Sequence, residues 1–182
     1  MNPRIAFIGA PLLTLVYGVI RLLSEHGPGL GWTTGHIAFL VALGLYGVVL
    51  IQLDRHTFTG FTVVGFAGLL AFAAQFVIDL VVGFMAADRA EMSDLFGRVY
   101  DTPGLDLLVR QAGPPLFYLA LFAIMTHLAS QRRIPFWIPV AVLVASVLPA
   151  FNLDLLPVSA VIILIAFAAT VREIVDLEQA RP

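Results

Sequence analysis

The chain has 182 residues, of which 60% are hydrophobic and only 12% are charged, and its mean hydropathy is +0.97. Soluble domains carry about 25% charged residues, so this composition predicts an integral membrane protein. The net charge of −2 provides no basic surface for nucleic acid. The sequence contains no cysteine, and all ten basic residues are arginine. Disulfides, thiolate chemistry and lysine Schiff bases are therefore excluded, and we expect no cofactor, no metal and no nucleic-acid partner.

Apolar runs recur along the whole chain, and a membrane-spanning helix needs about 20 such residues. We expect a single all-α integral membrane domain, a bundle of six transmembrane helices with one short interfacial amphipathic helix. The expected spans are about 5–23, 34–53, 61–85, 113–130, 135–150 and 155–172, and the interfacial helix covers about 88–100.

The expected interfacial helix lies in the longest connection, between the third and fourth spans. Apolar residues recur there at i, i+3, i+4, i+7 and i+8, which places them on one helical face: Met92, Leu95, Phe96, Val99 and Tyr100. Charged residues occupy the other faces. A short amphipathic helix of this kind is typical of the membrane interface.

The third expected span contains a single ionisable residue, Asp79. Residues four apart share a helix face, and stepping by fours through Asp79 gives a row of small and polar residues: Ala67, Ala71, Gln75, Asp79 and Gly83. Polar and small side chains in membrane helices turn toward neighbouring helices. We therefore expect this row to face the bundle, with Leu69 and Phe76 facing lipid.

Several polar residues are predicted at the depth of Asp79, toward one end of the bundle. Arg21 ends the first span, His36 begins the second, and Asp154 precedes the sixth. The candidate ligand- or ion-binding residues are Asp79, Gln75, Arg21 and His36. A buried carboxylate costs roughly 2.5–3.5 kcal/mol on insertion scales, so Asp79 needs a partner, water or a proton. A fixed Arg21–Asp79 ion pair and a neutral, hydrogen-bonded Asp79 are the structural alternatives to a binding role.

The arginines give the expected orientation, because short cytoplasmic loops carry an excess of positive residues. Arg4, Arg55, Arg132, Arg133, Arg172 and Arg181 fall on one side; Arg21, Arg89, Arg98 and Arg110 fall on the other. This distribution predicts a multi-pass protein of the cytoplasmic membrane with both termini in the cytoplasm.

Three functions are compatible with these residues. The first is a non-catalytic membrane subunit or regulator that packs with itself or with a membrane-protein partner in the lipid bilayer. The second is a small transporter or channel-like protein with a proton or cation site at Asp79. The third is a membrane enzyme acting on a lipid, with Asp79 and His36 as acid–base groups. The sequence has no nucleophile-elbow, zinc-protease or nucleotide-binding motif, which disfavours an enzyme and identifies no catalytic residue.

Overall fold

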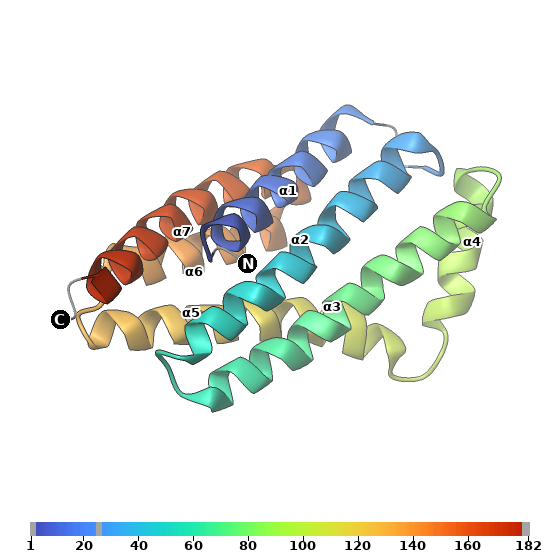
Figure 1. The fold of residues 1–182 in the computed structure, drawn as a ribbon. Helices are drawn as coiled ribbons and strands as arrows, with labels where there is room; N and C mark the ends of the chain where they lie inside the picture. Colours follow the sequence, from blue (N-terminus) through green and yellow to red (C-terminus); the bar gives the residue numbers. More distant parts are fainter. Residues whose placement is uncertain (1–2, 25–26, 180–182) are drawn as a thin grey trace.

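The computed structural model describes residues 3–24 and 27–179. Within these residues the chain is helical, with no strand. Arg181, which entered the orientation argument, lies outside them. The elements are α1 (Pro3–Leu23), α2 (Leu30–Asp54), α3 (Thr59–Met85), α4 (Arg89–Tyr100), a π-helical turn (Leu107–Ala112), α5 (Gly113–Ser130), α6 (Trp137–Phe151), a 3-10 turn (Leu153–Leu155) and α7 (Leu156–Gln179). The long helices run lengthwise through the bundle, and α4 lies at one end, beside the end of α3 (Figure 1).

Five of the helical segments are long and apolar enough to cross a membrane: Arg4–Leu23, Leu30–Asp54, Thr59–Met85, Leu107–Ser130 and Leu153–Glu173. The all-helical prediction is therefore confirmed. Helix α6, expected as the fifth span at 135–150, has only 15 residues and does not reach that length.

Three helix limits differ from the expected ones by more than two residues. Helix α2 begins at Leu30 rather than at 34, because Gly29 adopts a φ of 148° that few other residues tolerate and ends the loop there. The fourth long segment begins in the π-helical turn at Leu107, before Pro114 and Pro115. The N–H of Gly113 donates to the carbonyl of Leu108, so the turn joins α5 without a break. Helix α7 continues to Gln179, well past 172.

Helix α4 starts with reciprocal capping. The Asp88 carboxylate accepts from the Glu91 N–H at 2.9 Å, and the Glu91 carboxylate accepts from the Ala87 N–H at 2.8 Å. Its apolar face is partly covered, since Met92 is buried with Val82 and Ala86 at the end of α3. The helix therefore closes one end of the bundle over the last turns of α3.

The buried face of α3 differs from the predicted row of small residues. Ala67 is exposed, and Ala71, Gln75 and Asp79 are only partly buried, whereas Leu69 and Phe76 are buried. The reason is aromatic packing, because Phe76 stacks on Phe39 of α2 with ring centroids 4.2 Å apart. The prediction that Leu69 and Phe76 face lipid is wrong, and of the predicted row only Gly83 is fully buried.

Helices α3 and α5 approach one another at two glycines, Gly68 and Gly113. A β-carbon built on Gly68 would overlap the backbone nitrogen of Phe117 and would lie 2.9 Å from the Gly113 carbonyl oxygen. A clash with backbone atoms cannot be relieved by rotating a side chain. Close backbone approach at small residues is a common means of association for apolar helices, and here it fixes the position of α3, which carries Asp79.

We expect Gly68→Ala to lower the free energy of unfolding by about 1–3 kcal/mol, the usual cost of overpacking. Thermal unfolding in detergent micelles measures the loss. The matched control is Gly44→Ala on α2, where an added β-carbon meets nothing within 4 Å and alanine's helix propensity should leave stability unchanged or raised by up to about 1 kcal/mol. Equal effects of the two substitutions would contradict the close approach of α3 and α5.

Candidate functional site

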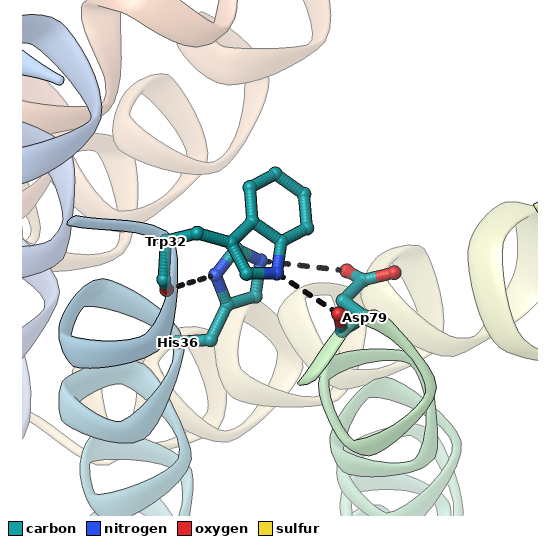
Figure 2. A network of polar contacts seen from close by, with 3 residues as sticks. All are labelled: Trp32, His36 and Asp79. Atoms are coloured by element: carbon teal, nitrogen blue, oxygen red, sulfur yellow. Dashed lines mark hydrogen bonds and ion pairs between the residues drawn. The ribbon is translucent and has the colours of Figure 1, made fainter. Parts of the chain in front are cut away.

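Trp32 and His36 lie one turn apart near the start of α2, and Asp79 lies in the last third of α3 opposite them (Figure 2). We call these three residues the α2–α3 network. The His36 and Asp79 side chains are only 4% and 14% exposed. The network therefore joins two polar side chains in an apolar interior, where unmet hydrogen-bonding capacity is costly.

The Trp32 indole bonds to the backbone of α3. Its Nε1–H donates to the backbone carbonyl of Asp79 at 2.9 Å. In a regular helix that carbonyl is also the acceptor for the N–H of residue 83, and residue 83 is a glycine. A β-carbon there would lie 2.5 Å from Cδ1 and Nε1 of Trp32. Gly83 thus leaves the flank of α3 open for the indole ring.

The His36 ring is held on several sides by aromatic neighbours. It stacks on Trp32 with centroids 4.0 Å apart, and Tyr17 of α1 and Phe76 of α3 contact it at 5.4 and 5.1 Å. Its Nδ1 lies 2.7 Å from the backbone carbonyl of Trp32. A carbonyl oxygen only accepts, so Nδ1 carries a hydrogen and donates. The other nitrogen, Nε2, then faces Asp79 Oδ2 at 3.7 Å.

Arg21 lies at the end of α1 but pairs with Asp154, not with Asp79. Its Nη2 is 3.8 Å from Asp154 Oδ1, so the structure does not support the Arg21–Asp79 ion pair that was one of the structural alternatives. The cause is the turn before α7, where Asn152 Oδ1 accepts from the Asp154 N–H at 2.9 Å and the turn packs beside α1. The Asp154 side chain is 53% exposed, so this surface pair contributes little to stability.

Gln75 lies one turn before Asp79 on α3 and takes no part in the α2–α3 network. Its Oε1 is buried and has no hydrogen-bond partner among the described residues. Of the four predicted site residues, the structure therefore brings His36 and Asp79 together and leaves Arg21 and Gln75 outside the pair.

A small pocket lies beside the network, between α1 and the start of α2. It is lined by Tyr17, Ile20, Arg21, Ser24, Gly31, Trp32, Gly35 and His36. The volume open to the centres of water molecules is ≈ 20 Å³, which suffices for about one water. Neither Asp79 nor Gln75 lines it.

Sequence analysis did not identify Trp32 as part of the site. A signal was present in the spacing, because Trp32 and His36 are four apart on α2 and Asp79 and Gly83 are four apart on α3. Each pair shares a helix face. What the spacing could not give is the rotation that turns these two faces toward one another.

No group of three or more histidine, aspartate or glutamate side chains that could hold a metal occurs within the described ranges. Comparison with protein-family models finds no match, and comparisons with curated proteins and with solved structures find none either. The fold alone therefore gives the class: among the described residues the protein is all-helical, with five segments long and apolar enough to span a membrane.

We expect Gly83→Ala to displace the Trp32 indole and break its bond to the Asp79 carbonyl, at a cost of about 1 kcal/mol or more. In a Trp137→Phe background Trp32 is the single tryptophan, so its fluorescence should shift to longer wavelength as the ring meets water. Gly97→Ala on α4, where an added β-carbon meets nothing within 4 Å, is the control. An unchanged emission maximum in Gly83→Ala would contradict the contact.

Proposed function

We propose that this protein is a non-catalytic, multi-pass membrane protein, a subunit or regulator that packs with a second copy or with another membrane protein. One observation carries the proposal: the pocket beside His36 and Arg21 holds only about one water, and the charged groups there lie next to one another, His36 by Asp79 and Arg21 by Asp154. A lipid substrate needs a far larger cavity, since ligand pockets usually measure about 300–1,000 Å³.

The proposed topology has six crossings, with α6 as a short one. Fifteen residues at 1.5 Å each extend about 22 Å, less than the ~30 Å hydrocarbon core, and local thinning of the bilayer accommodates such a mismatch. Helix α1 begins and α7 ends toward the same end of the bundle (Figure 1), as an even number of crossings requires. The arginine distribution then favours both termini in the cytoplasm, with α4 at the outer interface.

A transporter with a proton site at Asp79 is the second candidate, and the His36–Asp79 pair favours it. A transporter also needs a passage to its site, and the pocket does not reach Asp79. The acid–base enzyme needs His36 and Asp79 within hydrogen-bond reach of each other, and at 3.7 Å they are neighbours just beyond that distance. The pocket also offers no room for a lipid beside them. The subunit proposal requires neither a passage nor a substrate cavity.

Flux measurements separate these functions. In proteoliposomes with an imposed pH gradient, we expect the wild-type protein to give the same proton and cation flux as protein-free vesicles, and mass spectrometry of the vesicle lipids to show no turnover. Flux that Asp79→Ala abolishes would replace the subunit proposal with the transporter. Lipid turnover that His36→Ala abolishes would replace it with the enzyme.

A double-mutant cycle tests whether the α2–α3 network serves assembly of the fold. We expect His36→Ala and Asp79→Ala to show a coupling free energy of roughly 0.5–3 kcal/mol in unfolding, because each group loses its buried partner. The same cycle on Arg21→Ala and Asp154→Ala is the control, with an expected coupling below about 1 kcal/mol. Equal coupling free energies in the two cycles would contradict this prediction, because the buried His36–Asp79 pair would then stabilise the fold no more than the exposed Arg21–Asp154 pair.

A further inference from the structure

Two connections lie against each other at the end of the bundle opposite α4, the one between α2 and α3 and the one between α5 and α6 (Figure 1). Arg133 Nη1 is 3.1 Å from His56 Nδ1, and because a guanidinium has no acceptor, Arg133 donates. Just inside the connections, the rings of Phe61 and His127 contact each other with centroids 6.1 Å apart. The two connections are therefore joined by a polar and an aromatic contact.

The end of α5 turns the chain so that two consecutive arginines reach this junction. Arg132 has a φ of 57°, in the left-handed region, and the Arg133 N–H donates to the Leu128 carbonyl at 3.0 Å. This is a common way to end a helix and reverse the chain. It leaves the Arg132 side chain exposed, while Arg133 is half-buried beside His56.

Three guanidinium groups meet at the junction: those of Arg55, Arg132 and Arg133, which we call the arginine cluster. Arg55 is exposed and directly follows the last residue of α2. None of the three forms an ion pair with a carboxylate in the part of the chain that the structure describes. Asp54, next to Arg55, is half-buried, and its Oδ1 has no hydrogen-bond partner there. The positive charge of the cluster is thus not neutralised by a protein carboxylate in contact with it.

The opposite end of the bundle differs in this respect. There Arg21 pairs with Asp154, and Arg110 pairs with Asp106 at 3.1 Å. The arginine cluster lacks the carboxylate partners that those two arginines have, so an anion from outside the chain can take that place.

Exposed aromatic side chains flank the arginine cluster on both connections. Phe58 follows Arg55, and Phe136 and Trp137 follow Arg133; they are 66%, 70% and 47% exposed. Aromatic residues gather at the level of the lipid headgroups in membrane proteins. Their position beside the cluster places the three guanidiniums next to the phosphate groups of the bilayer.

We propose that the arginine cluster binds the headgroup of an anionic phospholipid, with Phe58, Phe136 and Trp137 against its acyl chains. A guanidinium donates two parallel N–H bonds to phosphate oxygens, and cationic residues near an anionic leaflet attract its lipids. A zwitterionic lipid has the same phosphate but also a cation of its own, which the cluster repels. The inference rests on the membrane location in the proposed function, but it does not require the subunit role.

Native mass spectrometry of the detergent-solubilised protein tests this preference, because it resolves single bound lipids. We expect the wild-type protein to bind a first phosphatidylglycerol more tightly than a first phosphatidylcholine. The double variant Arg55→Gln/Arg132→Gln should bind phosphatidylglycerol about fivefold more weakly for each arginine removed, with phosphatidylcholine binding unchanged. Both side chains are exposed, and Arg133 is kept because it bonds to His56, so the variant should fold.

The matched control is Arg89→Gln/Arg98→Gln, which removes two exposed arginines from α4 and causes the same change in net charge. This variant should keep the wild-type preference. Equal binding of the two lipids by the wild-type protein, or equal losses in the two double variants, would overturn the proposal. Displacement of phosphatidylglycerol by inorganic phosphate would also overturn it, since the site would then recognise a free ion. Proton or cation flux in proteoliposomes bears only on the subunit proposal and leaves the lipid preference in place.

Discussion

The hydrogen bond from His36 Nδ1 to the Trp32 carbonyl is the interaction on which the polar end of the bundle depends. It fixes which ring nitrogen carries the obligatory hydrogen, and it orients the ring so that Nε2 faces Asp79. The Trp32 indole stacks on one face of the His36 imidazole, and its Nε1–H donates to the backbone carbonyl of Asp79 on α3. One turn of α2 thereby contacts α3 twice, through the imidazole of His36 and through the indole of Trp32.

The same turn links the network to the helix that closes the bundle end. Trp32 is partly buried against the cluster formed by Val82, Ala86 and Met92, and its ring also contacts Phe96 of α4 with centroids 6.2 Å apart. Trp32 therefore contacts residues of both α3 and α4. The start of α2, the end of α3 and helix α4 thus meet around one aromatic side chain.

Much of this fold follows from composition and periodicity. Runs of apolar residues long enough to cross a bilayer predicted the all-helical class, and the i, i+3, i+4 pattern from Met92 to Tyr100 predicted a helix where α4 lies. The apolar run at 135–150 was expected to be a full span, but α6 has only 15 residues and is shorter than the helices long enough to cross a membrane. That Asp79 and His36 lie at a similar height could also be predicted, because helical rise converts sequence position into height, and their side chains are 3.7 Å apart.

Partner choice could not be predicted in the same way, because height does not fix the rotation of a helix about its axis. Arg21 and Asp79 share a depth, yet Asp154 takes the arginine because its turn packs beside α1. The row through Gln75 was chosen for its polarity, but the packing of Phe76 on Phe39 and the close approach at Gly68 turn α3 so that aromatic residues point inward. Aromatic area buried against neighbours outweighed the polarity of one amide, whose Oε1 is left without a partner.

The small pocket limits what the polar end of the bundle can hold. The volume open to the centres of water molecules is ≈ 20 Å³, which suffices for about one water. His36 lines this pocket, whereas Asp79 meets the imidazole from α3 and is not among the lining residues. What the pair contributes in the structure is therefore packing of α2 against α3, at the turn where the Trp32 indole also bonds to the Asp79 carbonyl.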